Sequence, residues 1–261
     1  MAGEPPLPQA FLGAPIAHRG LHGPGRPENS RAAIAAAAAA GYGVEIDVQL
    51  SADGRAMAFH DEGLGRLTAA AGPVRARTAA ELGAIPLRGG GEGIPTLEEA
   101  IEAAGGAPLL VEIKDQDGAM GPAVGALEAA AAPLLAARTA PTAVMSFNPH
   151  SVLALARLAP GLPRGIVTSA YRLRDWPRLP AATRRRLRAI PHWREAAIAF
   201  VSHEAAALAS PALAPLRAAG VPILCWTIRS PAAEAAARHL AANVTFEGYR
   251  PEWPFPPPSH A

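Results

Sequence analysis

The sequence Gly43-Val-Glu-Ile-Asp-Val-Gln-Leu50 predicts a short buried strand that carries two carboxylates. Side chains alternate across a strand, so the branched apolar residues face one side and Glu45 and Asp47 face the other. Two neighbouring acids repel each other, and burial raises the cost of ionising them. A core tolerates such a pair only where something neutralises it, and a bound cation is the simplest candidate. An exposed edge strand with a polar face is the alternative for these residues taken alone.

The segments on either side of this strand predict a βαβ unit followed by a hairpin. A short apolar strand at 14–18 precedes an Ala-rich helix that ends at Gly41, so strands 14–18 and 43–50 should be parallel. A tight turn at Asp53-Gly54 then leads into the short run 56–60. Because a parallel crossover needs about a dozen residues or more, 56–60 should pair antiparallel with 43–50.

The rest of the chain alternates strands with helices. Without the hairpin strand, eight strand segments are each followed by a helix or a tail, which is typical of a (β/α)8 TIM barrel. An open doubly wound sheet is the alternative, but no Gly-x-Gly-x-x-Gly turn follows the first strand. We therefore predict one α/β barrel domain over 1–261, with a short insertion at 62–95 and a Pro-rich tail at 250–261. We also predict a long Ala-rich helix over about 119–138.

Composition and charge narrow the class of protein. Half of the 261 residues are hydrophobic and the net charge is +2, which gives no reason to expect nucleic acid or an anionic membrane as a partner. Cys225 is the only cysteine and lies in an apolar run, which predicts a buried thiol and excludes internal disulfides. We see no secretory signal and no run long enough to span a bilayer. We expect a cytoplasmic protein without stable membrane insertion.

In a TIM barrel, the chemistry gathers at the carboxyl ends of the strands. Glu112 and Lys114 repeat the spacing of Glu45 and Asp47, so each pair points to one face of its strand. Lys114 is also the only lysine in the chain. The polar and aromatic residues at the predicted strand ends are His18, Arg19, Glu45, Asp47, His60, Asp61, Glu112, Lys114, Ser146 and Trp226.

This set of side chains fits the cleavage of a phosphodiester. Carboxylates are hard oxygen ligands, so Glu45, Asp47 and Glu112 are predicted to bind one divalent cation, Mg²⁺ or Ca²⁺. Arg19 and Lys114 can neutralise the phosphate oxygens.

The two strand-end histidines supply acid and base. An alkoxide is a poor leaving group, so one of His18 and His60 should protonate it while the other takes a proton from the attacking oxygen. The sequence leaves open which histidine does which. Glu28 is a candidate substrate contact, or its negative charge interacts favourably with the dipole of the following helix. Trp226 either walls the substrate pocket or packs in the core.

The ordered motifs of residues 14–114 resemble the glycerophosphodiester phosphodiesterase family. That resemblance implies a (β/α)8 barrel with a small insertion after His60-Asp61, a divalent cation at the three acids, two catalytic histidines, and phosphate contacts from the Arg and the Lys. Two departures stand out: Arg229 follows Ile228 where the family often has Asn, and the last strand ends Thr245-Phe-Glu-Gly instead of Thr-Asp. The motifs are Ala17-His-Arg-Gly, Pro27-Glu-Asn-Ser, Glu45-Ile-Asp-Val-Gln-Leu, Phe59-His-Asp, Ile94-Pro-Thr-Leu-Glu-Glu and Val111-Glu-Ile-Lys.

The expected activity is hydrolysis of a small glycerophosphodiester to an alcohol and glycerol 3-phosphate. A lysophospholipase D-like activity on single-chain lipids is the alternative, and it needs a wide apolar mouth that Leu64, Leu67, Ile85 and Leu87 of the insertion could line. A non-catalytic phosphate-binding barrel is a third possibility, expected if a catalytic group were missing, but none is. The alcohol group, the natural metal and the oligomeric state stay open.

Overall fold

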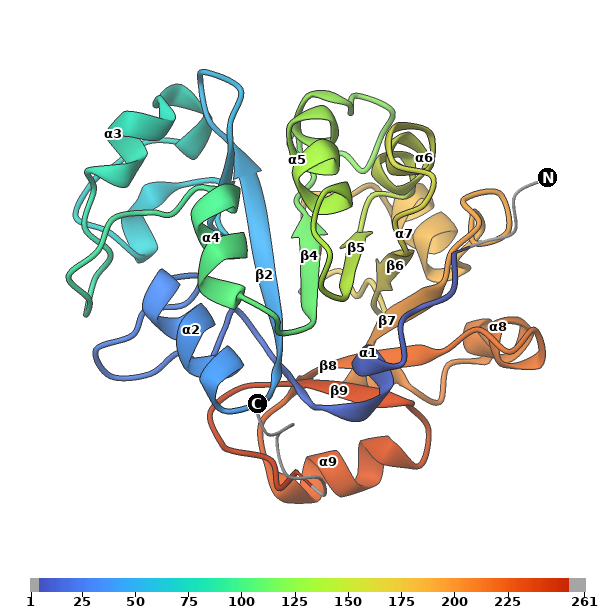
Figure 1. Cartoon of the computed structure of the whole chain (residues 1–261). Coiled ribbons are helices and arrows are strands. Elements are labelled where there is room, and N and C mark those ends of the chain that lie inside the picture. The colour runs from blue at the N-terminus through green and yellow to red at the C-terminus, as the bar shows by residue number, and fades with distance from the viewer. Residues whose placement is uncertain (1–4, 254–261) are drawn as a thin grey trace.

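A closed barrel of parallel strands is the body of the computed structural model, which describes residues 5–253 (Figure 1). Neighbouring strands follow the order β1-β9-β8-β7-β6-β5-β4-β2-β3, and an additional pairing of β1 with β2 closes the ring. The predicted (β/α)8 barrel is therefore confirmed. The strands of the ring are β1 (Ile16–Ala17), β2 (Gly43–Leu50), β4 (Leu109–Ile113), β5 (Thr142–Ser146), β6 (Arg164–Thr168), β7 (Phe200–Glu204), β8 (Ile223–Ile228) and β9 (Asn243–Phe246).

The predicted hairpin after the second strand is also confirmed. β3 (Ala56–Ala58) pairs antiparallel with β2 and stays outside the ring. Gly54 takes the positive φ of 78° that the tight turn requires, which glycine adopts without steric cost. The N–H of Phe59 donates to the carbonyl of Asp47 at 3.0 Å, so the hairpin sets His60 beside the carboxyl end of β2.

Helices surround the strands in Figure 1, and most begin at a residue that the sequence marks. Ser30 and Thr96 cap the helices after β1 and before β4, since each side chain accepts a backbone N–H of the first turn. The helices are α1 (Ala10–Gly13), α2 (Arg31–Ala39), α3 (Ala79–Gly83), α4 (Leu97–Ala104), α5 (Ala126–Ala136), α6 (Pro149–Leu158), α7 (Ala181–Arg188), α8 (Ala214–Ala218) and α9 (Pro231–Arg238). Shorter 3-10 turns lie at Leu64–Arg66, Val74–Ala76, Ala205–Ala207 and Pro211–Leu213.

The long helix predicted over 119–138 is wrong at its start. Helix α5 begins at Ala126, and the residues before it form a loop. Within the predicted range, Met120 and Gly125 adopt φ of 53° and 130°, which an α-helix does not contain. Asp115 stabilises this loop, because its carboxylate accepts a hydrogen bond from the backbone N–H of Met120 at 3.0 Å.

The core has two layers, one on each side of the sheet. The apolar side chains of β2 pack outward under the helices, whereas Glu45 and Asp47 point inward, as the alternation predicts. Phe200 fills the barrel interior, and Gly165 on the neighbouring strand makes room for it. A Cβ at Gly165 would lie 2.4 Å from that ring. The other interior side chains are Leu7, Phe11, Ile16, Leu110, Ala143, Met145, Val167 and Leu224.

The insertion at 62–95 has a small hydrophobic cluster of its own. Leu64 and Leu87 are buried in this cluster around Phe59, and Leu67 and Ile85 pack against it. The suggestion that these four leucine and isoleucine side chains line an apolar mouth is therefore wrong, because they pack against the insertion itself.

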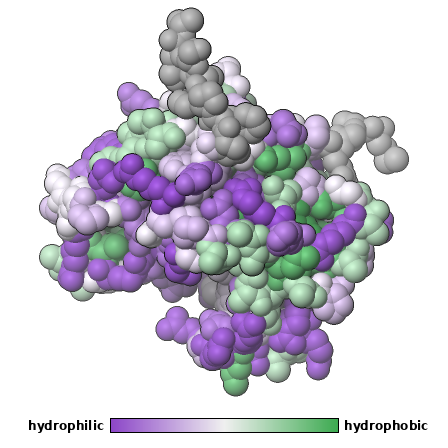
Figure 2. Space-filling view, turned by 90° about the horizontal axis from the view of Figure 1, so that it is seen from below, coloured by the Kyte–Doolittle hydropathy of each residue, from purple (hydrophilic) through white to green (hydrophobic). Residues whose placement is uncertain are grey.

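The helices and the surface were compared with what a membrane protein requires. Between residues 5 and 253, no helix has both the length and the apolar character that crossing a bilayer demands. The face seen from below in Figure 2 carries hydrophilic side chains interspersed with smaller hydrophobic patches.

The predicted Pro-rich tail is described only in part, because residues 254–261 lie outside the described residues. Pro251 is buried, and its carbonyl accepts a hydrogen bond from the Tyr42 hydroxyl at 2.9 Å.

Candidate active site

A cavity of about 160 Å³ opens where the barrel strands end at their carboxyl side. It brings together nearly every residue that the sequence singles out for metal, phosphate or proton transfer. The predicted residues that line it are His18, Arg19, Glu45, Asp47, His60, Glu112, Lys114 and Trp226.

The three predicted metal ligands converge because of strand geometry. Glu45 and Asp47 lie two residues apart on β2, and Asp47 is the register partner of Glu112 on β4. Each residue offers a carboxylate oxygen, and these oxygens lie within 4.8 Å of one another. All three side chains are buried. A compact set of carboxylate oxygens suits a hard divalent cation such as Mg²⁺ or Ca²⁺, whereas zinc favours nitrogen and sulfur ligands.

The charged side chains inside the cavity lie close enough to shift one another's pKa. Burial, followed by repulsion from Asp47, raises the pKa of Glu45 well above its usual value. Burial also acts against ionisation of Asp47, but the nearby cations, Lys114 first, outweigh it and hold the pKa of Asp47 far below its usual range. Glu45 is therefore the acid that would gain most from additional positive charge.

Lys114 contacts two of these acids directly. Its Nζ lies 2.7 Å from Oε1 of Glu112 and 3.3 Å from Oδ1 of Asp47. Burial lowers the pKa of Lys114, but the attraction of the two carboxylates is larger and raises it overall. Lys114 is thus held charged at the cavity.

The turn after β1 orients Arg19. Arg19 and Gly20 both have positive φ, 56° and 76°, and Gly20 packs so tightly on α2 that a Cβ would lie 2.6 Å from the carbonyl carbon of Ala33. The N–H of Arg19 donates to Oε2 of Glu45 at 3.0 Å. Its guanidinium Nε lies 3.2 Å from Oδ2 of Asp47. Arg19 therefore contacts two of the acids before any substrate binds.

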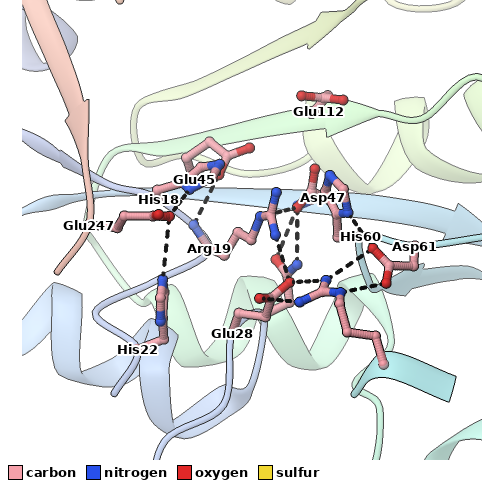
Figure 3. Close-up of polar contacts among 12 residues, drawn as sticks. His18, Arg19, His22, Glu28, Glu45, Asp47, His60, Asp61, Glu112 and Glu247 are labelled. Atoms are coloured by element: carbon pink, nitrogen blue, oxygen red, sulfur yellow. Dashed lines mark hydrogen bonds and ion pairs between the residues drawn. The ribbon is translucent and has the colours of Figure 1, made fainter. Parts of the chain in front are cut away.

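The two histidines have carboxylate partners on the same ring nitrogen (Figure 3). Nδ1 of His18 lies 2.6 Å from Oε2 of Glu247, and Nδ1 of His60 lies 2.6 Å from Oδ1 of Asp61. The other nitrogen of His18, Nε2, is 4.0 Å from Glu45. Burial lowers the pKa of His18, although Glu247 opposes that effect. In both rings Nε2 stays free of the carboxylate partner.

Glu28 does not line the cavity. Its Oε1 accepts from Nη1 of Arg19 at 2.7 Å, and both of its oxygens accept from Arg66 at 2.7 and 2.9 Å. Arg66 also donates to Asp61 at 2.6 and 3.0 Å. Glu28 thus connects Arg19 to the carboxylate partner of His60, and its predicted substrate contact stays a prediction.

Two supporting residues were not predicted in these roles. Asn29 donates from Nδ2 to Oδ2 of Asp47 and accepts the Asp47 N–H, both at 3.1 Å. Its positive φ of 58° is one that Asn tolerates better than most residues. Glu247 lies one residue beyond β9, so the rule that chemistry gathers at strand ends would have singled it out.

A second cavity of about 670 Å³ adjoins the first. Trp226 lines both cavities, with its Nε1 donating to the carbonyl of Ser202 at 3.2 Å. The ring of Phe147 lies 5.5 Å from that of Trp226 and 5.0 Å from that of Trp176, measured between centroids. Met120 and Leu179 complete an apolar wall. Trp226 therefore lies where the sequence suggested a pocket wall.

Comparison with known proteins yields one consistent family. The model of the glycerophosphoryl diester phosphodiesterase family matches residues 18–246. A glycerophosphodiester phosphodiesterase of Caldanaerobacter subterraneus subsp. tengcongensis is 38% identical over 110 residues, which cover 40% of this chain and 45% of the relative. The matched part thus spans less than half of that relative. An uncharacterized protein of Bacillus subtilis is 32% identical over 164 residues, covering 59% of this chain and 66% of the relative.

Solved structures show the same likeness over nearly the whole chain. A phosphodiesterase of Oleispira antarctica, in complex with the product sn-glycerol-3-phosphate, has a TM-score of 0.74 and 28% identity, covering 91% of this chain and 94% of that one. A glycerophosphodiester phosphodiesterase of Thermotoga maritima has a TM-score of 0.68 at 22% identity, covering 89% and 94%, and shares the fold.

Proposed function

Because this chain belongs to the glycerophosphoryl diester phosphodiesterase family, we propose that it hydrolyses glycerophosphodiesters to an alcohol and glycerol 3-phosphate. The observation that carries the proposal is the convergence of two imidazoles, two cationic side chains and three buried carboxylates on one cavity. The Oleispira antarctica phosphodiesterase, 28% identical to this chain, holds sn-glycerol-3-phosphate, and that supports the substrate class.

The reaction is assigned to side chains around one cation site. Glu45, Asp47 and Glu112 would hold a single Mg²⁺ or Ca²⁺, because their oxygens are close together and hard. When bound, the cation would hold a non-bridging phosphate oxygen and offset the charge that develops on it. Arg19 and Lys114 bind the other phosphate oxygens, and their contacts with the acids keep both cations directed at the cavity.

The histidines transfer the protons. The attacking oxygen, from water or from the glycerol hydroxyl of the substrate, forms a bond to phosphorus while the bond to the alcohol oxygen breaks. Attack by water gives glycerol 3-phosphate directly, whereas attack by the hydroxyl gives a cyclic phosphate that water must then open. We assign His18 as the base that accepts the proton of the attacking oxygen, because burial lowers its pKa and favours the neutral ring. His60 is then the acid that protonates the departing alkoxide.

Lysolipid hydrolysis is a second candidate, and the larger cavity supports it. Its apolar wall of Met120, Phe147, Trp176, Leu179 and Trp226 lies next to Lys114 and could receive a bulky alcohol or an acyl chain. Trp226 belongs to β8 itself, and the other four come from the loops after β4, β5 and β6, not from the insertion.

A release assay tests both candidates. Glycerophosphocholine, glycerophosphoethanolamine, glycerophosphoinositol and a lysolipid would be offered in turn with Mg²⁺ or Ca²⁺, and the released glycerol 3-phosphate or lysophosphatidate measured. We expect release from at least one glycerophosphodiester, and loss of that release in His18→Ala. Binding of the diesters without release from any of them would favour a non-catalytic phosphate-binding barrel and overturn the proposal.

A further inference from the structure

We propose that Glu247 and Arg229 form a unit that positions His18, an inference that rests on the proposed function of His18 in catalysis. Glu247 does not line the active-site cavity, and Arg229, which does, would act on His18 through Glu247. Glu247 would fix the ring orientation and the tautomer of His18, and Arg229 would hold the carboxylate in place.

The two carboxylate oxygens of Glu247 contact different partners, His18 and Arg229. Oε2 of Glu247 faces Nδ1 of His18 at 2.6 Å (Figure 3). Oε1 accepts from Nε of Arg229 at 2.8 Å, with Nη2 at 2.6 Å. His22 is also near, but its Nε2 lies 3.8 Å from Oε2, beyond hydrogen-bond distance. Each carboxylate oxygen therefore has its own close partner.

This contact determines what His18 can offer to the cavity. A carboxylate accepts hydrogen bonds and does not donate them, so the short bond requires the proton of a neutral His18 on Nδ1. Nε2 then carries the lone pair, and it is the nitrogen that lies 4.0 Å from Glu45. A ring flip would move Nδ1 away from Glu247 and break the bond.

Backbone contacts hold the same three residues at adjacent strand ends. The N–H of His18 donates to the carbonyl of Phe246 at 2.9 Å, and the N–H of Glu247 donates to the carbonyl of Ile228 at 2.9 Å. His18, Arg229 and Glu247 thus each follow a strand of the ring, namely β1, β8 and β9. The carboxylate does not depend on a long loop for its position.

The other histidine has the same arrangement. Nδ1 of His60 lies 2.6 Å from Asp61, and Asp61 accepts from Arg66 at 2.6 and 3.0 Å. Imidazole, carboxylate and guanidinium follow in the same order in both places. Because the carboxylates come from unrelated parts of the chain, the repetition favours a shared positioning role over chance.

Steady-state kinetics with a hydrolysed glycerophosphodiester would test the unit. We expect Glu247→Ala to lower kcat by roughly 10–100-fold with little change in KM, the loss typical of a residue that orients an imidazole. Glu247→Gln keeps an acceptor oxygen and should lose less. Arg229→Met leaves the bond to His18 in place and should lose least of the three.

A matched control is available on α9. Glu234 accepts two bonds from Arg238, at 2.6 and 2.8 Å, and one from the Tyr249 hydroxyl at 2.9 Å. Glu234→Gln therefore weakens a comparable ion pair away from His18, and it should leave kcat unchanged. Equal losses of kcat in Glu234→Gln and Glu247→Gln would mean that only general stability is affected, and would overturn the unit.

Two further readouts separate positioning from structure. In the His18→Ala background, adding Glu247→Ala should cost nothing more with an activated aryl diester, because the residue through which Glu247 acts is gone. In the wild-type protein, ¹⁵N shifts of the neutral His18 ring should show the proton on Nδ1. A proton on Nε2, or an undiminished kcat in Glu247→Ala beside an inactive His18→Ala, would overturn the inference while leaving the proposed function intact. A wild-type kcat in His18→Ala would instead refute the catalytic role proposed for His18.

Discussion

Asp47 and Glu112 are direct register partners on the neighbouring parallel strands β2 and β4. The separation of these two proposed ligands is therefore set by backbone pairing, and Glu45 follows from the two-residue period of the same strand. Lys114, one residue beyond β4, repeats that period, and its Nζ contacts both acids. A site built on strands in this way keeps its geometry better than one built on loops.

Removal of the cation should abolish hydrolysis. An excess of chelator should stop turnover, and added Mg²⁺ or Ca²⁺ should restore it. Glu45→Gln should weaken cation binding, seen as a smaller rise of Tm when the cation is added, because a ligand that binds the native state stabilises it. Glu128→Gln, a buried acid that caps α5, is the matched control. Full turnover in excess chelator would refute metal dependence.

Loss of the Lys114 charge should impair phosphate binding. We expect Lys114→Ala to lower kcat/KM by roughly 10²–10³-fold, comparable to the loss of one group that stabilises developing charge. Lys114→Arg should recover part of the loss because it keeps a cation near Glu112. Circular dichroism would verify the fold of both variants. Unchanged kinetics in Lys114→Ala would remove this residue from the phosphate site.

The assignment of acid and base predicts different leaving-group effects. His60→Ala should slow an alkyl diester by roughly 10²–10⁴-fold, the usual contribution of a general acid, and an activated aryl diester much less. His18→Ala should slow both, because each still needs its attacking oxygen deprotonated. The reverse pattern would exchange the two roles, and equal losses with both substrates in both variants would show that neither is a dedicated acid.

Packing inside the barrel predicts a stability effect. Gly165→Ala would place a Cβ 2.4 Å from the Phe200 ring, so we expect a loss of about 1–3 kcal/mol in the free energy of unfolding. Gly161→Ala is the control, because nothing lies within 4 Å of its added Cβ. Urea denaturation of both variants would measure the difference. Equal stability of the two would contradict the tight contact.

Cys225 should be unreactive in the folded protein. Burial raises the pKa of its thiol to about 12, so almost no thiolate forms near neutral pH. Because the unfolded thiol ionises at lower pH than the folded one, this group favours unfolding as pH rises from about 9 to about 12. We expect iodoacetamide to label Cys225 in denaturant only, monitored by mass spectrometry. Rapid native labelling would contradict the burial.

The parts of the site that follow local rules were predictable from the sequence. Alternation along β2 predicts that Glu45 and Asp47 share a face, and the short turn at Asp53-Gly54 forces the antiparallel hairpin. The prediction of a helix over 119–138 was wrong at its start because the Ala content was given more weight than the break at Gly125. The sequence patterns describe single helices and strands, whereas this break lies in the loop that precedes α5.

Contacts between distant strand ends were not predictable in this way. Glu247 is separated from His18 by 229 positions, and Arg66 reaches Glu28 across 38. No periodicity links such residues, since only the closure of the barrel and the course of the insertion bring them together. The apolar wall was missed for the same reason, because Trp176 and Phe147 follow different strands.

The ring closes where β1, only two residues long, pairs on one side with β2 and on the other with β9. During synthesis on a ribosome, His18 emerges early, but its strand has only one neighbour until the β9 segment leaves the exit tunnel. A nascent chain that stops before Glu247 contains the three acids of β2 and β4 but has no carboxylate to place beside Nδ1 of His18. Full hydrolytic competence should therefore arise late in translation, once β9 pairs with β1 and Glu247 reaches His18.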